Sequence, residues 1–364
     1  MYMKRDLRFD AHLNVGKVYQ GKTGSVEMFY SGKEIADYCN HFNLTHAICI
    51  YDEYENLKEL IDNTNTKIYG VQWIVDNDQE LDCGKEGWHG IKLHSHRGYR
   101  DGRKYDVKHP KRKRSEKEQA KVKMEMGELR SFGMDYADGY IKEILERLPQ
   151  GSLVYMHSQG WPSLTNRARP EHLFMLATEF YNLKFIMGHA GGYGGMVGAL
   201  PGPHVPPTTR EKSNHVYSRS IRNYVDSVMT FKASAHYANS VHNLFLDSSC
   251  YTPDKAIALR DTNKWCVGSD YPFGANKPRN SEGNDESNHW VREDFNKPYV
   301  WNFNKQTRLF IEAMGEDAVQ EGFQSMLDYC EKTMEELAQE QFDKINELKV
   351  HVKAEKTKYK NNES

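Results

Sequence analysis

The sequence contains few cysteines, and their spacing excludes a framework held together by disulfides or by a cysteine-bound zinc ion. Six cysteines occur in 364 residues, and no two of them form a Cys-x-x-Cys pair. They are Cys39, Cys49, Cys83, Cys250, Cys266 and Cys330. Scattered cysteines, several of them within predicted strands, are typical of buried free thiols in a reducing compartment.

Long hydrophobic runs and an excess of charge of one sign are absent as well. No apolar stretch approaches the roughly 18 residues that cross a bilayer, and the beginning, MYMKRDLRFD, lacks the apolar core of a signal peptide. The formal net charge is -2, which gives no general argument for binding nucleic acid or a membrane. We therefore expect a cytoplasmic protein whose partner is a small molecule, with no nucleic acid and no membrane involved.

What the sequence does contain is a regular alternation of short apolar runs with segments of helical spacing. Most runs are apolar on both faces, which is typical of parallel strands covered by helices. Eight such runs predict a (β/α)8 barrel, also called a TIM barrel. They cover residues 7–13, 45–50, 67–75, 90–96, 152–159, 183–192, 243–248 and 265–270.

Three long insertions interrupt the predicted barrel, which occupies residues 1–304. They lie at about 97–130, 193–219 and 274–300, and are charged, rich in glycine and proline, or rich in asparagine. Insertions of this length in compact domains are usually functional or disordered. The basic run in the first insertion, KHPKRKRSEKEQAKVK, predicts a solvated helix and loop; a lid that attracts an anionic substrate is the alternative.

Helical spacing continues through the C-terminal extension, residues 305–364. It contains a rough apolar stripe of Met334, Leu337, Phe342, Ile345 and Leu348. Such a stripe more often packs on its own domain than on a partner. We therefore expect this extension to pack on the barrel, and a homodimer is the alternative.

Polar residues gather at the ends of the predicted strands. In the first strand His12 and Asn14 share a face with Asp10, and burying such a face is unfavourable unless the groups have partners. Later strands end at His94, His157, His189 and Asp270. One such residue alone is most simply a core histidine or a helix cap. Several at matching strand ends predict a site, because barrel enzymes place catalytic groups there.

Imidazoles and a carboxylate that converge at one barrel mouth are ligands suited to a first-row divalent metal. Such a metal lowers the pKa of a bound water or polarises a substrate carbonyl. In this interpretation Asp270 binds the metal and accepts the proton of the water. His189, if it is not a ligand, stabilises the developing oxyanion.

Five motifs carry a resemblance to a known family. They are DAHLNVG at 10–16, GIKLH at 90–94, YMHSQG at 155–160, GHAGG at 188–192 and GSDYPF at 268–273. Their order resembles the amidohydrolase superfamily and is similar to its amidohydrolase-related branch, also called amidohydrolase 2. That branch includes aminocarboxymuconate-semialdehyde decarboxylase, dihydroxybenzoate decarboxylases and pyrone-dicarboxylate lactonase.

The resemblance implies one divalent metal, commonly Zn2+, with Mn2+ or Fe2+ as alternatives. It implies His12, His157 and Asp270 as ligands and His189 as the substrate-polarising histidine. The family normally has His-x-His in the first strand, whereas this chain has Asn14 at the second position. An amide oxygen is a poorer ligand for zinc than imidazole. The site is therefore expected to be weaker, to prefer a harder metal, or to be empty, as in the metal-independent lactonases of this branch.

The leading hypothesis is a metal-dependent hydrolase of a small carboxylate-bearing amide, ester or lactone, with Asp270 as general base. Lys92, His94 and Arg97 would position the substrate. Elsewhere in the superfamily a carboxylated lysine bridges two metals, but the IKLH setting of Lys92 resembles the mononuclear branch more. A non-oxidative decarboxylase of an unsaturated or aromatic acid is the first alternative. A barrel that has lost catalysis and acts as a binding protein is the second.

Overall fold

The computed structural model describes residues 7–20, 26–74, 79–93, 139–158, 170–191, 231–249, 253–271 and 305–362. Nine strands of this part form one sheet in the order β2-β1-β3-β4-β5-β6-β7-β8-β9. The strands are β1 Phe9–Gln20, β2 Val26–Tyr30, β3 His46–Tyr51, β4 Lys67–Trp73, β5 Trp88–Leu93, β6 Leu153–Met156, β7 Lys184–Met187, β8 Leu244–Asp247 and β9 Trp265–Cys266. All pairings are parallel except that of β1 with β2.

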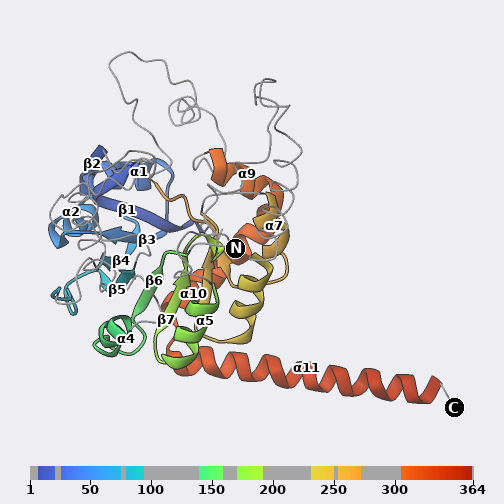
Figure 1. Cartoon of the computed structure of the whole chain (residues 1–364). Helices are drawn as coiled ribbons and strands as arrows, with labels where there is room; N and C mark the ends of the chain where they lie inside the picture. Colours follow the sequence, from blue (N-terminus) through green and yellow to red (C-terminus); the bar gives the residue numbers. More distant parts are fainter. Residues whose placement is uncertain are drawn as a thin grey trace, which may run out of the picture.

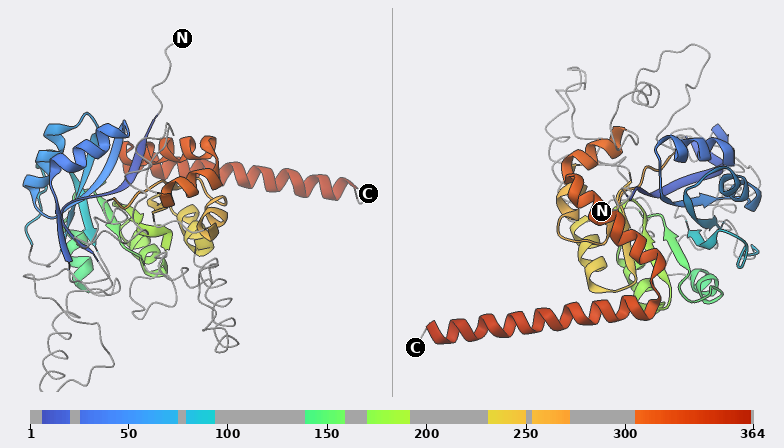
Figure 2. Two further views of the ribbon diagram at one scale, coloured as in Figure 1. Left: turned by 90° about the horizontal axis from the view of Figure 1, so that it is seen from above. Right: turned by 180° about the vertical axis from the view of Figure 1, so that it is seen from behind.

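The two ends of the parallel sheet meet, so the eight parallel strands form a barrel. The backbone N–H of Ala11 in β1 donates to the carbonyl of Val267, just after β9, at 2.8 Å. The N–H of Asn14 donates to the carbonyl of Tyr271 at 2.8 Å, and Leu13 pairs with Tyr271 in parallel fashion. The predicted (β/α)8 barrel is confirmed, and each predicted strand is present (Figures 1 and 2).

Helices cover the outside of the barrel, as the helical spacing predicted. They are α1 Gly32–His41, α2 Tyr54–Asn63, α4 Gly139–Glu146, α5 Pro170–Glu179 and α7 Pro253–Leu259, and residues 231–240 are helical as well. Helix α1 begins with a capping box, in which the Ser31 hydroxyl accepts from the N–H of Glu34 and the Glu34 carboxylate accepts from the N–H of Ser31. This box fixes the start of the helix after Ser31.

The sequence did not predict β2. The first strand runs on to Gln20 instead of ending near Leu13, and its second half pairs antiparallel with β2. This pairing adds a hairpin beyond the barrel. Its signal is weak in the sequence because β2, VEMFY, is only five residues long.

Helices α9 Lys305–Met314, α10 Glu316–Glu331 and α11 Met334–Asn362 follow the barrel. Helix α10 lies at the amino-terminal ends of the strands: the hydroxyl of Tyr329 is 2.9 Å from the carbonyl of Phe185 and 2.8 Å from that of Asn243. Helix α10 therefore does not cover the opposite, carboxyl-terminal ends of the strands. None of the helices in the described ranges is both long and apolar enough to cross a bilayer.

The three predicted insertions lie entirely outside the described residues. So do His94 and Arg97, two of the predicted substrate-binding residues.

Candidate active site

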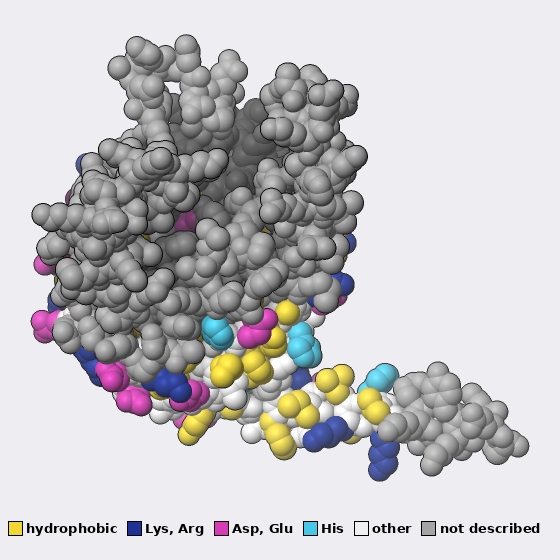
Figure 3. All heavy atoms as spheres, viewed as in Figure 1, with side chains coloured by type: hydrophobic (Ala, Val, Ile, Leu, Met, Phe, Trp, Pro, Cys, Tyr) yellow, Lys and Arg dark blue, Asp and Glu magenta, His cyan; other side chains and the backbone are white. Residues whose placement is uncertain are grey.

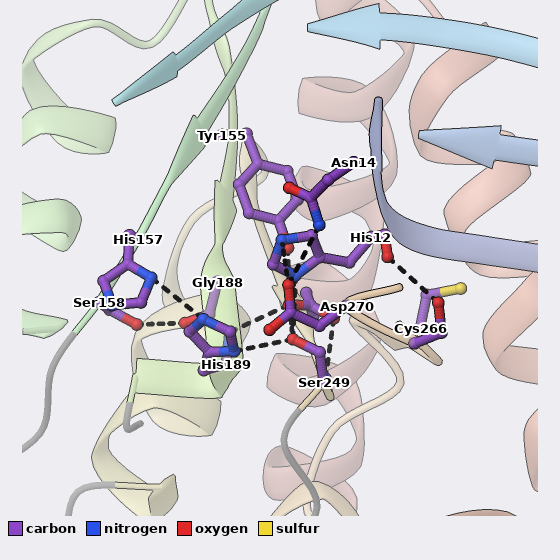
Figure 4. Close-up of polar contacts among 12 residues, drawn as sticks. His12, Asn14, Tyr155, His157, Ser158, Gly188, His189, Ser249, Cys266 and Asp270 are labelled. Atoms are coloured by element: carbon purple, nitrogen blue, oxygen red, sulfur yellow. Dashed lines mark hydrogen bonds and ion pairs between the residues drawn. The ribbon is translucent and has the colours of Figure 1, made fainter. Parts of the chain in front are cut away.

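Four of the predicted site residues, with Asn14, lie together at the carboxyl-terminal ends of the strands (Figure 4). His12 belongs to β1, and His157 directly follows β6. His189 follows β7 and Asp270 follows β9. The convergence results from the barrel, which brings strand ends far apart in sequence to one mouth.

An irregularity in β1 turns His12 towards this group. Asp10 pairs with Ala47 and Leu13 with Cys49, so the register shifts between them. The fully buried Asp10 carboxylate accepts from the N–H of His12 at 3.0 Å and from the N–H of Ser269 at 2.9 Å. Burial raises the pKa of Asp10 to about 7, although these hydrogen bonds lower it. Bulges near active sites often redirect a side chain in this way.

Asp247, at the end of β8, is the hydrogen-bonding centre of the site. Its carboxylate accepts from the Tyr155 hydroxyl at 2.6 Å, from the His189 N–H at 3.1 Å and from the Ser249 N–H at 2.8 Å. It also lies 3.1 Å from Nδ1 of His12. Burial alone would raise the pKa of Asp247, but His12 and the hydrogen bonds lower it well below its usual value. Asp247 is therefore an ionised acceptor that fixes several neighbours.

His12 lies between two carboxylates. Because Asp247 is an acceptor, the hydrogen-bond network assigns the His12 proton to Nδ1, which also lies 3.0 Å from the Ser249 hydroxyl. Its other nitrogen, Nε2, then presents a lone pair 3.2 Å from Oδ1 of Asp270. Burial raises the pKa of Asp270, and Lys92 and His12 act in the opposite direction.

Asn14 contacts Asp270 through its side-chain nitrogen. Nδ2 donates to Oδ1 of Asp270 at 3.3 Å and to the carbonyl of Tyr271 at 3.2 Å. The carbonyl of Tyr271 can only accept, so it fixes which end of the amide faces the site. In this orientation Asn14 offers a hydrogen-bond donor to Asp270, and a metal would require its oxygen instead.

His189 connects Asp247 and Ser249 to His157. The Ser249 hydroxyl donates to Asp247, so its oxygen accepts from Nδ1 of His189 at 2.8 Å. Nε2 of His189 then accepts from Nδ1 of His157 at 3.0 Å, which assigns the lone pair of His157 to Nε2. Burial lowers the pKa of His189 well below its usual value, so His189 is neutral.

The backbone at the site adopts left-handed conformations at three residues other than glycine. The φ angles are 56° at His189, 50° at Ala190 and 54° at Asp270. Each such residue is disfavoured by roughly 1–3 kcal/mol and persists only where its surroundings impose it. The strain coincides with the residues that the sequence singled out for catalysis.

Two lysines bring positive charge into this buried region. Lys92 is 3% exposed, and its Nζ lies 4.0 Å from the centroid of the Tyr155 ring. Lys255, in α7, is fully buried and donates to the carbonyl of Ser249 at 2.5 Å. A buried lysine near a carboxylate site can hold an anionic substrate group.

The donors present fit a divalent metal ion. Ligating atoms of His12, His189 and Asp247 all lie within 4.8 Å of one another, which supports a metal site in this region. Two ligands on a tetrahedral ion are separated by about 3.3 Å, given bonds of roughly 2.0–2.1 Å. The separation of 3.2 Å between Nε2 of His12 and Oδ1 of Asp270 agrees with this value. Both oxygens of Asp247 already accept hydrogen bonds, so Asp247 is better suited to orient His12 than to bind metal.

Sequence reasoning missed several residues of the site: Asp247, Ser249, Tyr155 and Lys255. Asp247 carried a usable signal, since it ends an apolar run, NLFLDS, just as Asp270 ends another. Tyr155 lies within a motif that was singled out for its histidine. Lys255 lies in the helix after β8, and nothing in its local sequence indicates that it is buried.

Comparison with known proteins gives only distant matches. No protein-family model matches the sequence, and no curated protein matches it. A solved amidohydrolase from Burkholderia multivorans with bound zinc is 10% identical, with a TM-score of 0.41 over 73% of this chain and 85% of that chain. Amidohydrolase 2 from Bifidobacterium longum subsp. infantis is 11% identical, with a TM-score of 0.42 over 89% of this chain and 97% of that chain.

Proposed function

We propose that this protein is a metal-dependent hydrolase of the amidohydrolase type, acting on a small carboxylate-bearing amide, ester or lactone. One observation carries the proposal: Nε2 of His12 and Oδ1 of Asp270 face each other at 3.2 Å while Asp247 holds the other nitrogen of His12. Two lone pairs at this distance repel each other unless a proton or a cation lies between them. A divalent ion meets that requirement and matches the ligand chemistry.

In this proposal His12, His157 and Asp270 hold the ion. The hydrogen-bond network supports both histidines, because it assigns the lone pair to Nε2 in each of them. When bound, the ion supplies an acidified water and polarises the scissile carbonyl. Zn2+ is the first candidate, and Mn2+ and Fe2+ are alternatives because a site without a second first-strand histidine is less selective for zinc.

The chain's own residues orient the site and move the proton. Asp270 accepts the proton of the attacking water and later returns it to the leaving group. Asn14 holds the carboxylate of Asp270 in position through its donated hydrogen bond. Asp247 keeps the imidazole of His12 in one tautomer and orientation, as carboxylates behind ligating histidines do.

His189 is neutral and can therefore donate to an oxygen that gains negative charge. To do so through Nε2, it exchanges its contact with His157 for one with the substrate and takes the tautomer with the proton on Nε2. The Ser249 hydroxyl then turns to donate to Nδ1 of His189. Lys92, buried beside Tyr155, holds the substrate carboxylate. His94 and Arg97, which follow β5 directly in the sequence, extend this anion-binding region in the proposal.

A non-oxidative decarboxylase is a second candidate, and the environment of Asp270 favours it. Burial raises the pKa of this carboxyl, so Asp270 can hold a proton and deliver it to the carbon that loses carbon dioxide. Hydrolysis instead needs Asp270 to be ionised before the reaction. The two functions use the same site residues. They differ in whether the Asp270 carboxyl is ionised or protonated before the reaction.

The first test is the metal content of the untagged full-length protein, purified without chelators, measured by elemental analysis beside an Asn14→His variant. About one equivalent of zinc, manganese or iron in the parent supports the proposal. Absence of metal from both proteins contradicts it. Metal in the variant alone supports a metal-independent lactonase or a binding protein that has lost catalysis.

The second test identifies the reaction. The metal-loaded protein is incubated in H2-18O with panels of lactones, esters, amides and unsaturated or aromatic acids. Incorporation of 18O into an acid product supports hydrolysis, and carbon dioxide release without incorporation supports decarboxylation. An Asp270→Asn variant is the control, and a rate unchanged in that variant contradicts both candidates.

A further inference from the structure

Helix α11 leaves the barrel soon after it begins. Met334 and Leu337 are 5% and 8% exposed, because they pack against the barrel core. Phe342, Leu348 and Val352 are 57%, 64% and 49% exposed. Figures 1 and 2 show α11 pointing away from the barrel in every view, and Figure 3 shows hydrophobic side chains gathered along it.

The exposed apolar residues form a stripe on one face of α11. Phe342, Ile345, Leu348 and Val352 follow one another at spacings of three, three and four residues, which is one side of a helix. Val350 is also exposed but points to a different side. The stripe continues the face that Met334 buries against the barrel. A face that is buried at its start and then exposed calls for a partner that the barrel itself does not supply.

Charge pairs along α11 do not explain how the helix is stable where it extends beyond the barrel. Residues four apart on a helix are neighbours, and like charges there are destabilising. Four such pairs in the sequence of α11 carry like charges, and one pair, Glu340 with Lys344, carries opposite charges. The like pairs are Glu336 with Glu340, Asp343 with Glu347, Lys349 with Lys353, and Lys356 with Lys360. An isolated helix of this kind, with large apolar residues in water, is marginally stable.

The charges of α11 are instead divided between its two halves. Residues 334–347 contain five acids and one lysine, a net charge of -4, and residues 348–362 contain five lysines and one acid, a net charge of +4. The helix dipole favours this order only in the first and last turns, whereas Asp343, Glu347 and Lys349 lie in the middle. Two copies side by side in antiparallel orientation place opposite halves next to each other, and a parallel pair places like halves together.

We infer that α11 is a dimerisation element, which pairs with α11 of a second copy in antiparallel orientation through the stripe of Phe342, Ile345, Leu348 and Val352. The pairing is self-complementary, as a two-fold axis requires. The axis crosses the helix near Leu348, where the charge changes sign. With the axis at Leu348, residues 342–354 of the two copies lie opposite each other, which is about 18 Å of helix. This inference is independent of the proposed catalytic activity.

The molecular mass in solution tests the pairing, by light scattering on the full-length protein at micromolar concentration. The chain mass is 42.3 kDa, and we expect twice that value for the parent. Ile345→Asp combined with Leu348→Asp changes two exposed residues of the stripe and should give a monomer that remains folded by circular dichroism. The matched control Val350→Asp, off the stripe, should remain a dimer. A monomeric parent, or a double variant that is still dimeric, overturns the inference.

Cysteine cross-linking tests the orientation, in a Cys83→Ser background because Cys83 is exposed. Lys349→Cys lies next to the proposed axis and should form an intermolecular disulfide with its own copy. Glu335→Cys lies about 20 Å from the axis along the helix, so its two copies are about 40 Å apart and should not cross-link. Equal cross-linking at both positions indicates a parallel pair, and cross-linking at neither position places the interface elsewhere. Either result overturns the antiparallel arrangement.

Discussion

The side-chain nitrogen of Asn14 donates a hydrogen bond to the carboxylate of Asp270, at 3.3 Å. In the proposed family this position is a second histidine that binds metal directly. In the proposed mechanism the contact gives Asn14 a different role, which is to hold the carboxylate that acts as general base. An amide can keep this carboxylate in position and ionised without competing for the metal.

Replacement of Asn14 by alanine removes this donor, and we expect kcat/KM to fall about 2- to 13-fold while the protein stays folded. The loss of one hydrogen bond costs roughly 0.5–1.5 kcal/mol, which corresponds to a factor of about 2–13. Steady-state kinetics on the substrate found in the panel and a urea titration measure the two effects. Asn40→Ala, which removes an exposed side-chain contact to Asn63, is the control and should leave kinetics unchanged. Unchanged kinetics in Asn14→Ala would show that the contact has no role in the reaction.

Asp247→Asn should weaken metal binding 10- to 100-fold, because loss of a carboxylate behind a ligating histidine has an effect of that size. The amide also fails to accept all the bonds that the carboxylate accepts, so the free energy of unfolding should fall as well. Metal affinity is measured by competition with a chromophoric chelator. The control is Asp82→Asn, a buried carboxylate bonded to Tyr51 outside the site, which should lower stability only. Equal metal affinity in the parent and in Asp247→Asn would show that Asp247 does not support metal binding.

Gly268→Ala should displace Asp247 and His12, because the backbone of Gly268 lies directly against both side chains. A Cβ at this position would lie 2.0 Å from Oδ1 of Asp247 and 3.0 Å from Cβ of His12. Both neighbours are buried and held by hydrogen bonds, so they cannot move away easily. We expect a lower thermal midpoint and loss of bound metal. Gly84→Ala is the comparison. No atom lies within 4 Å of the added Cβ and the φ of Gly84 is positive, so this variant introduces backbone strain without a close contact. A Gly268→Ala protein that binds metal like the parent would contradict the close approach of Gly268 to Asp247.

The stability of the protein should rise with pH between about 7 and 9, in part because of Lys264. Burial, with repulsion from Lys344, lowers the pKa of Lys264 to about 7 from 10.5. Above pH 7 the unfolded chain therefore binds more protons than the folded chain, and stability increases with pH. Below pH 7 both states carry the proton and the full destabilisation is present. Urea titrations at pH 6, 7, 8 and 9 measure this, and Lys264→Met should show a smaller rise. An identical pH dependence in the variant would show that Lys264 titrates normally.

Much of the fold could be predicted from the sequence because its signals are local. Apolar runs such as the one that contains β7 form strands whatever their partners, since both faces need burial. The positions of His12, His157, His189 and Asp270 at strand ends followed from the same runs. Once eight strands were counted, the barrel required those ends to meet at one mouth.

The sequence by itself thus determined the barrel, the side of the barrel that holds the site, and the chemical type of its residues. The tertiary structure decided which atoms meet: the lone pair of His12 directed at Asp270, the nitrogen of Asn14 turned to the same carboxylate, and Asp247 placed behind His12. His12 and Asp247 are 235 positions apart, so no local pattern relates them. The direction of α11 was decided in the same way, because an apolar stripe specifies burial but not the surface that provides it. Hydrophobic periodicity acts along the chain, whereas hydrogen-bond partners depend on distances that exist only after the barrel closes.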